Sequence, residues 1–457
     1  MSGLSGRGLR GSQAHSSPTH VAVIGAGLTG SLLACYLARR GHTVTVYERR
    51  PDPRTTAAER GRSINLALSE RGIDALRRVG LHQRVLVDAL PMRGRMIHPV
   101  DGELDFQQYS LDGRRAINSI SRGALNNALL DEAAATPGVR IVFEHRLTGL
   151  DPLVFATPAG EAKAAADVVI GADGAGSAVR GQLLGMGLLD ESVDFLDYGY
   201  KELSIAAGPD GDFAMDPGAL HIWPRGTSMM IALPNPDRTF TCTLFWPHGG
   251  TSSLASLGSP AAIERHFRAV YPDVVPLMPN LVEDYRLNPV GLLGTVRCGP
   301  WQAATPGGPV GLIGDAAHAI VPFYGQGANC GFEDCVVLDR VLDETGDDFA
   351  AALPLFDTRR RDDVEAIATM ALNNFVEMRD KVASPVFQLG KKIEHALERA
   401  LPGRYVSRYE LVSFSTTPYA QVRDRVRRQH RVLGAVGALA LGGLGALGAA
   451  VARGRRR

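Results

Sequence analysis

The 457-residue chain carries no excess of charge of either sign and contains few cysteines. Its 49 basic and 48 acidic residues leave a net charge of +1. This balance argues against a nucleic-acid-binding protein, since such proteins usually carry a basic excess. The cysteines are dispersed, odd in number and never in a C-x-x-C pair; they are Cys35, Cys242, Cys298, Cys330 and Cys335. The pattern argues against a disulfide framework or a cysteine zinc site and predicts reduced thiols in a cytoplasmic protein.

The composition also lacks the polar bias of a disordered protein. Hydrophobic residues make up 45% of the chain and charged residues 21%, as in ordinary globular proteins. At roughly 150 residues per domain, the length allows two or three domains. Residues 1–19 differ, because they are rich in Gly, Ser and Arg and have neither an acidic residue nor the apolar run of a signal peptide. We expect a disordered leader there, with a transit peptide as the alternative.

The C-terminal end is a weakly hydrophobic segment without charge. Residues 432–452 contain six glycines and seven alanines, and arginines flank them on both sides. As a helix the segment would span about 31 Å, close to the roughly 30 Å of a bilayer core. Two interpretations remain open for the tail, residues 432–457. One is membrane association helped by arginine contacts with anionic lipid, and the other is a tail lying on the protein surface.

Short apolar runs and turn residues outline the secondary structure. Residues 20–24 and 43–47 predict strands on either side of a helix at 31–40, which is a βαβ unit. Further along, the pattern predicts an antiparallel sheet with strands at 219–224, 228–234 and 240–247, a buried strand at 310–313, and helices at 329–343 and 355–380.

A glycine motif lies at the first strand-to-helix turn. Gly25, Gly27 and Gly30 form a G-x-G-x-x-G motif, and Glu48 ends the second strand. The glycines allow a tight turn, close approach of a pyrophosphate and close helix–strand packing, and the acid can bind a ribose hydroxyl. Because the motif has both the strand–helix context and the acid about 20 residues on, it predicts a dinucleotide site.

Two further motifs follow apolar strands. Asp173 comes after the run 168–171 and is either a cofactor contact or the cap of the next helix. Asp315, in the segment 314–318, can hold a ribityl or ribose hydroxyl. The glycine loop after it opens a helix near Asn329, and the amides of that helix end would stabilise a negatively charged reduced flavin.

Together the three motifs resemble the flavin-dependent aromatic hydroxylases, which use one FAD and NAD(P)H. The chain lacks a second strong G-x-G-x-x-G unit, which fits a permanently bound FAD and a transient NADPH. Longer stretches are similar to the kynurenine 3-monooxygenase family in particular; they are residues 61–68, 91–98, 221–225, 229–235, 240–245 and 314–334. The pair Phe323-Tyr324 departs from that family, whose members carry Phe or His in the second position.

The resemblance implies an α/β (α+β) fold with a Rossmann-like FAD-binding domain, an antiparallel-sheet substrate domain and a C-terminal helical region. We place the FAD-binding domain at residues 20–190 and 295–345, the substrate domain at 191–294 and the helical region at 346–431, between the leader and the tail.

The motifs and the resemblance together give a set of cofactor-binding residues. It comprises Gly25, Gly27, Leu28, Thr29, Gly30, Tyr47, Glu48, Arg49, Arg50, Ala67, Arg122, Leu147, Asp173, Asp315, Ala328 and Asn329. A fixed cation such as Arg122 can neutralise a pyrophosphate, although a surface arginine is its alternative interpretation. No metal site is expected.

The substrate residues implied by the resemblance are Arg95, Tyr109, Asn374 and Tyr419, with Glu377 nearby. L-Kynurenine has an amino-acid head and an aniline ring, and a guanidinium pairs bidentately with a carboxylate. Glu377 is expected to orient the Asn374 helix or to balance the substrate ammonium. Arg93 competes with Arg95, because two residues two places apart share a face of a regular strand.

The implied activity is hydroxylation of L-kynurenine to 3-hydroxy-L-kynurenine in tryptophan degradation. NADPH reduces the flavin, O2 forms a flavin C4a-hydroperoxide, and the substrate ring attacks it, so no protein catalytic residue is assigned. Alternatives are an aromatic hydroxylase acting on another ring and a flavin-binding, membrane-associated protein without turnover. A flavin halogenase is disfavoured because its W-x-W-x-I-P signature is absent.

Overall fold

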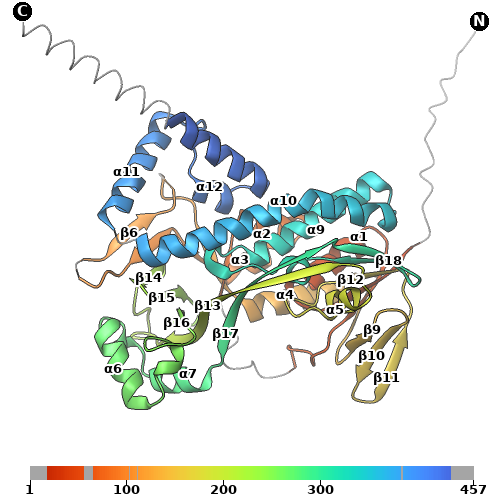
Figure 1. The fold of residues 1–457 in the computed structure, drawn as a ribbon, viewed down its shortest axis with the longest axis horizontal. Helices are drawn as coiled ribbons and strands as arrows, with labels where there is room; N and C mark the ends of the chain where they lie inside the picture. The colour runs from red at the N-terminus through yellow and green to blue at the C-terminus, as the bar shows by residue number, and fades with distance from the viewer. Residues whose placement is uncertain (1–17, 56–64, 102, 111, 382–383, 434–457) are drawn as a thin grey trace, which may run out of the picture.

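The computed structural model describes residues 18–55, 65–101, 103–110, 112–381 and 384–433 (Figure 1). Two large sheets and the helices packed on them make up most of this part of the chain. The leader up to residue 17, positions 61–64 of the family-like stretches and residues 434–457 of the tail lie outside the described residues.

The first sheet has six strands, and all neighbours are parallel except one pair at its edge. Its order is β18 (Gln302–Thr305), β19 (Gly308–Leu312), β12 (Val168–Gly171), β1 (His20–Ile24), β2 (Thr43–Tyr47) and β8 (Val139–Val142), with β18 antiparallel to β19. Ile24 lies opposite both Tyr47 and Gly171, so the carboxyl ends of β2, β1 and β12 meet at one edge. Ligands of doubly wound sheets bind at this edge.

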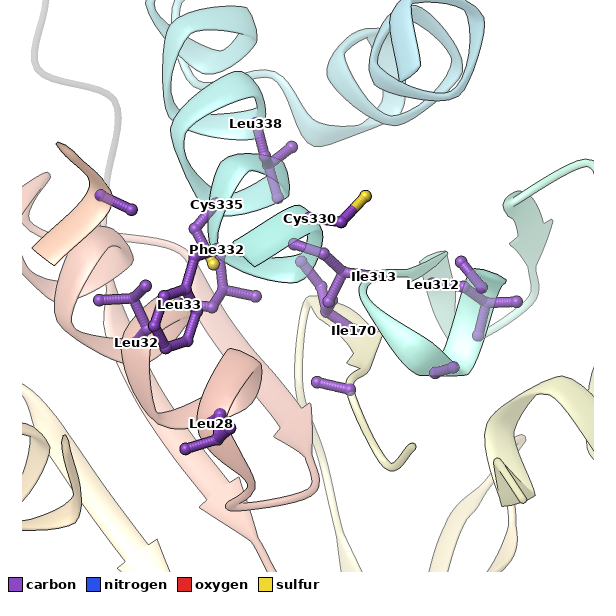
Figure 2. Packing of buried hydrophobic residues seen from close by; sticks show 14 of the residues in the cluster. Leu28, Leu32, Leu33, Ile170, Leu312, Ile313, Cys330, Phe332, Cys335 and Leu338 are labelled. Carbon is purple, nitrogen blue, oxygen red and sulfur yellow. The ribbon is translucent and has the colours of Figure 1, made fainter. Parts of the chain in front are cut away.

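Helices cover the first sheet and form a hydrophobic core with it. Among them are α1 (Leu28–Arg39), α4 (Arg122–Ala135), α9 (Gly327–Thr345) and α10 (Phe349–Val376). Figure 2 shows Leu32 and Leu33 of α1 against Phe332 and Cys335 of α9, with Ile313 beside them. Because α1 and α9 are packed on each other, the two glycine-rich helix starts are held as one unit.

The second sheet has seven strands and is antiparallel except where β14 meets β5. Its order is β17 (Val290–Gly299), β13 (Asp190–Ile205), β16 (Phe240–Pro247), β15 (Ser228–Pro234), β14 (Ala219–Arg225), β5 (Gly94–Ile97) and β6 (Asp105–Gln108). Alternate side chains of β15 point to opposite faces. Met229, Ile231 and Leu233 face a cavity, whereas Met230 and Ala232 pack with α6 (Pro260–Val270) and α7 (Leu281–Leu287).

A buried polar chain lies on the face of this sheet that turns away from the cavity. His98 follows β5, and its Nδ1 lies 3.1 Å from Asp273 Oδ2. Its Nε2 lies 2.8 Å from His221 Nδ1 on β14, and His221 Nε2 lies 2.8 Å from the Asp216 carbonyl. Trp223 Nε1 donates to the same Asp273 oxygen at 2.7 Å. The chain thus connects a partly exposed carboxylate with two buried imidazoles.

Smaller elements complete the body. Two three-stranded sheets contain β3 (Asn65–Leu68), β7 (Ile117–Ser121) and β4 (Leu90–Met92) in one, and β9 (Arg146–Gly149), β10 (Leu153–Thr157) and β11 (Gly160–Ala164) in the other. The remaining helices before α10 are α2 (Glu70–Arg78), α3 (His82–Val87), α5 (Ala178–Gly185) and α8 (Asp315–His318).

The C-terminal region starts where α10 ends in a π-helical turn, η4 (Glu377–Lys381). It continues with α11 (Pro385–Ala400), α12 (Arg408–Ser413) and a helical stretch at 419–433. In Figure 1, α11 and α12 lie together at one end of the molecule, beside the end of α10. Within the part of the chain described here, no helix is both long enough and apolar enough to cross a bilayer.

The predicted fold class is confirmed, and the predicted strands and helices agree with the structure to within a few residues. The predicted domain boundaries stay a prediction. The seven-stranded sheet takes β5 and β6 from inside the segment assigned to FAD binding, and β14 pairs with β5 in parallel. The second sheet is therefore not antiparallel throughout.

Candidate cofactor and substrate site

A cavity of about 660 Å³ is lined by residues from both large sheets. Its volume lies within the range of roughly 300–1,000 Å³ that is usual for ligand pockets. One half lies at the carboxyl ends of β1, β2 and β12, and we call it the flavin half. The other half is lined by β5, β14, β15, β16 and α12, and we call it the substrate half.

The glycine motif of the flavin half fits a phosphate. Gly25 has φ +106°, and a Cβ added at Gly30 would lie 2.0 Å from the Gly25 carbonyl oxygen. Gly30 therefore allows the close packing of α1, and it lies behind the cavity wall. Gly27 has open space around it, and no side chain caps the start of α1. The free amides at this helix end are suited to a pyrophosphate.

Glu48 is fixed in its ionised form at the end of β2. Its Oε2 accepts a hydrogen bond from the Ala26 amide at 3.0 Å. Its Oε1 accepts from the amide and Nε of Arg50 at 3.0 and 2.9 Å. Burial alone would raise the pKa of Glu48, but Arg50 and the amide bonds outweigh it and lower the pKa. An ionised carboxylate lining the cavity can still accept a bond from a ribose hydroxyl.

Asp173 uses its carboxylate to cap a helix. Its oxygens accept hydrogen bonds from the Ser177 hydroxyl at 2.5 Å and from the Ala178 and Val179 amides at 2.6 and 3.3 Å. Burial nevertheless raises the pKa of Asp173. The residue lines the cavity, but of the two alternatives for this motif the structure favours the cap of α5.

The third motif presents a carboxylate and a helix start. Asp315 begins α8, is exposed to the cavity and makes no side-chain hydrogen bond to another described residue. The Asn329 side chain, by contrast, is used inside the protein: its Nδ2 donates to the Ala67 and Gly325 carbonyls, and its Oδ1 accepts from the Ser69 amide. At Asn329 the backbone at the start of α9 is therefore what can face a flavin.

A buried charge network, which the sequence analysis missed, holds this loop from behind. Asp334 Oδ2 accepts the Gly314 amide at 3.0 Å and lies 2.6 Å from His318 Nε2. Arg360 Nε donates to Asp334 Oδ1 at 2.8 Å. Burial would raise the pKa of Asp334, but His318 and Arg360 lower it to about 2.

Three ligand-type atoms of this network, from His318, Cys330 and Asp334, lie within 4.8 Å of one another. Arg360 donates to Asp334 and, at 3.2 Å, to the Cys330 sulfur. The guanidinium thus supplies the positive charge that a metal ion would bring.

Arg95 is the principal charge of the substrate half. It is 7% exposed, its Nε has no hydrogen-bond partner, and no carboxylate of the described residues lies within 4 Å of it. Its guanidinium lies 4.7 Å from the ring centre of Tyr409 and 6.0 Å from that of Tyr109. A buried cation without an anion is costly, so this geometry favours a negatively charged ligand group. Arg93 lies in the break between β4 and β5 and is exposed, which separates it from Arg95.

The structure does not bring all predicted substrate residues into the cavity. Asn374, Glu377 and Tyr419 are not among its lining residues. Asn374 Nδ2 donates to the Phe323 carbonyl at 2.6 Å, and Glu377 Oε2 pairs with Arg408 at 2.8 Å. The Tyr419 hydroxyl donates to Gln326 Oε1 at 2.8 Å, with the Arg71 guanidinium over its ring. Their side chains contact other protein residues, so substrate contact by Asn374 and Tyr419, and either expected role of Glu377, stay predictions.

Tyr409 is one of the lining residues that the sequence did not reveal. Its ring stacks on Tyr109 with centres 4.7 Å apart and on Tyr324 with centres 5.8 Å apart. It belongs to α12, ten positions before the predicted Tyr419, and nothing in its local sequence distinguishes it. Phe245, Phe323 and Met378 add further apolar wall.

Apart from Gly30 behind the wall, every predicted cofactor residue lines the cavity, as do Arg95 and Tyr109. These contacts with FAD and substrate stay predictions, since the structure shows placement and not binding.

Comparisons with known proteins agree with this geometry. The FAD binding domain family matches residues 18–198 and 302–369. Kynurenine 3-monooxygenase of Myxococcus xanthus (strain DK1622) is 52% identical over 405 residues, covering 87% of this chain and 86% of the relative. The enzyme of that name from Salinispora arenicola (strain CNS-205) is 45% identical over 447 residues, covering 96% and 97%.

Among solved structures, 2-methyl-3-hydroxypyridine-5-carboxylic acid oxygenase has a TM-score of 0.64 at 20% identity, covering 86% of this chain and 100% of that one. The p-nitrophenol 4-monooxygenase of Pseudomonas putida DLL-E4 has a TM-score of 0.65 at 20% identity, covering 83% and 94%. At this identity, the structures show a shared fold.

Proposed function

The chain belongs to the kynurenine 3-monooxygenase family, and from this we propose that it hydroxylates L-kynurenine to 3-hydroxy-L-kynurenine with FAD, NADPH and O2. It is an FAD-dependent monooxygenase. The observation that carries the substrate assignment is Arg95, a buried cation without a carboxylate partner among the described residues, beside two stacked tyrosine rings in the cavity.

The residues of the flavin half fit FAD. The amides at the start of α1 and Arg122 would hold the pyrophosphate, and Glu48 would hold a ribose hydroxyl. Asp315 offers its carboxylate to the ribityl chain, and the start of α9 would face the flavin ring with its free amides. When bound, reduced by NADPH and reacting with O2, FAD supplies the electrophilic oxygen atom.

Arg95 is proposed to pair with the substrate carboxylate. A guanidinium offers two parallel donors to a carboxylate, and burial strengthens that pair. Tyr109 and Tyr409, stacked on each other, lie beside the guanidinium and restrict where the amino-acid head can lie. Fixing this head orients the aromatic ring of the substrate toward the flavin half.

The walls of the substrate half exclude water and offer no base. Leu220, Met229, Ile231 and Phe245 line one side. The described titratable residues that line this half are Arg95 and tyrosines, namely Tyr109, Tyr200, Tyr324 and Tyr409. Burial raises the pKa of Tyr109, Tyr324 and, most strongly, Tyr409. None of them takes up a proton at neutral pH. The amino group of the substrate itself activates the ring, and the protein orients the substrate and excludes water.

The assay is direct. Purified protein loaded with FAD is given NADPH, O2 and L-kynurenine, and 3-hydroxykynurenine and NADPH oxidation are measured. Equal product and NADPH consumption supports the proposal. Hydroxylation of another aromatic amine in preference to kynurenine would show that the proposed substrate is wrong. Absence of any turnover by the FAD-loaded protein would overturn the proposed activity.

We also propose that residues 432–457 contact an anionic membrane surface. The support is the uncharged run flanked by arginines, whose charge favours anionic lipid. Vesicles with and without phosphatidylserine, spun down with the full chain and with a chain ending at residue 431, test this. Equal sedimentation of the two chains would overturn it.

A further inference from the structure

Tyr409 needs support from outside its own helix. Among the described residues 384–433, it is the one that lines the cavity. Its helix α12 has six residues, and isolated helices this short are not stable in water. Contacts with the rest of the protein must therefore set the position of the Tyr409 ring over Arg95.

The residue just before Tyr409 makes such a contact. Arg408 donates from one terminal nitrogen to Glu377 Oε2 at 2.8 Å. The two side chains are only 31% and 18% exposed, so solvent screens the pair less than a surface ion pair. Glu377 opens the π-helical turn η4, which also carries the cavity residue Met378. The pair thus ties α12 to the end of α10 beside the cavity.

Glu377 could act in two ways on an amino-acid substrate. It could bind the ammonium group directly, or it could act through Arg408. The geometry favours the second, because Glu377 is not a lining residue and its carboxylate is engaged by Arg408. Tyr324, which stacks on Tyr409, also interacts with Arg408 and so belongs to the same support.

We propose that Glu377 and Arg408 form a positioning pair that holds Tyr409 over Arg95 and thereby sets the affinity for the amino-acid head of the substrate. Glu377 is a positioning residue that acts through Arg408, not a ligand of the ammonium. The proposal rests on the proposed function, since it takes kynurenine as the substrate.

Two substrates separate the two roles of Glu377. One is L-kynurenine, and the other is its analogue with hydrogen in place of the α-amino group, which keeps the carboxylate and the aminobenzoyl ring. Steady-state kinetics are measured for wild type, Glu377→Gln, Arg408→Met and the double variant. We expect KM to rise about 5- to 30-fold for both substrates in each single variant, with kcat nearly unchanged. The double variant should be no worse than either single variant, because the two residues act through each other.

The chain offers a matched control. Arg423 pairs with Asp362 of α10 at 3.0 Å, so Arg423→Met removes another ion pair between the C-terminal region and α10. It should leave KM unchanged, and Arg408→Lys should recover part of the affinity. FAD content and thermal midpoint are recorded for every variant, so a folding defect is separated from a loss of affinity.

A rise in KM for kynurenine but not for the analogue in Glu377→Gln would show a direct ammonium contact and overturn the proposal. Additive losses in the double variant would overturn it too. Failure of the proposed function looks different, because the wild type would then turn over neither substrate.

Discussion

The two halves of the cavity are built in different ways. The flavin half uses backbone amides, glycines and acids that follow strand ends within short contiguous motifs. The substrate half uses single side chains from three segments: Arg95 and Tyr109 beside the paired strands β5 and β6, Tyr324 before α9, and Tyr409 on α12. The predicted cofactor residues are therefore placed by local structure, whereas the predicted substrate residues are brought together by tertiary packing.

The halves also differ in how charge is balanced. Behind the flavin half, Arg360 is paired with Asp334 and Glu333. In the substrate half, Arg95 is buried beside tyrosines without a carboxylate partner among the described residues. The charge of Arg360 is balanced by protein carboxylates, whereas the proposed substrate carboxylate would balance that of Arg95.

The largest expected effect comes from breaking the complete network. In Asp334→Asn, Arg360 and His318 lose their buried anion, and removing one partner of a buried pair typically costs about 3–5 kcal/mol. We expect a loss of that order in the free energy of unfolding by urea and weakened FAD retention, because the Gly314 loop loses its anchor. Wild-type stability and FAD content in this variant would contradict the role of the network.

Removing the charge of Arg95 should weaken substrate binding and leave FAD binding unchanged. Arg95→Ala is expected to weaken kynurenine binding roughly 30- to 3,000-fold, from about 2–5 kcal/mol for a desolvated pair. FAD content should stay normal, and Arg95→Lys should recover only part of the affinity. Flavin absorbance is titrated with kynurenine. The exposed Arg93 gives the control, since the Arg93→Ala variant should bind kynurenine normally. Loss of binding in Arg93→Ala but not in Arg95→Ala would assign the carboxylate site to Arg93.

As the pH falls, we expect the stability contribution of His221 to be lost before that of Asp334. Burial and the positive charge of His98 lower the pKa of His221 from 6.5 to about 4. Between these values the unfolded chain binds more protons, so stability falls as pH drops from 6.5 toward 4, by at most about 3 kcal/mol.

The Asp334 contribution is present above about pH 4 and is lost only as pH falls toward 2. Urea unfolding at pH 6.5 and pH 4.5 measures the difference in wild type and in His221→Gln. The variant should lose most of this pH dependence, and an unchanged dependence would assign it to other groups.

The smallest expected effect distinguishes the ring of Tyr409 from its hydroxyl. Tyr409→Phe keeps the stacking on Tyr109 and should raise the KM for kynurenine only about 2- to 10-fold. Tyr405 is also buried but lies outside the cavity, so Tyr405→Phe serves as the control and should have no effect on KM. A larger loss in Tyr409→Phe than in Arg95→Ala would make the hydroxyl the main substrate contact.

The same contrast explains how much could be predicted from the sequence. Gly25, Glu48 and Asp315 could be found because a strand end, a turn and a helix start lie next to each other in the chain. Asp173 shows the limit of such a motif, since its carboxylate caps α5. The pairing of β14 with β5 and the Asp334 network depend on contacts between distant segments, which no local pattern contains.

The substrate residues show this limit more clearly. Arg95 and Arg93 would share a face only in a regular strand, and the break between β4 and β5 places them apart. Tyr409 and Tyr419 are both tyrosines of the C-terminal region. Packing alone brings Tyr409 to Arg95 and Tyr419 to Arg71.

In the polar chain behind the second sheet, the contact with a backbone carbonyl fixes which atoms donate and which accept. A carbonyl can only accept, so His221 donates its Nε2 proton to Asp216 and accepts one from His98 at Nδ1. His98 therefore donates from Nε2 to His221, and its Nδ1 faces the Asp273 carboxylate, which also accepts from Trp223. Asp273 is the exposed end of this hydrogen-bonded chain. The polar chain therefore meets the medium at Asp273, on the face of the sheet opposite the cavity, and none of its members lines the substrate half.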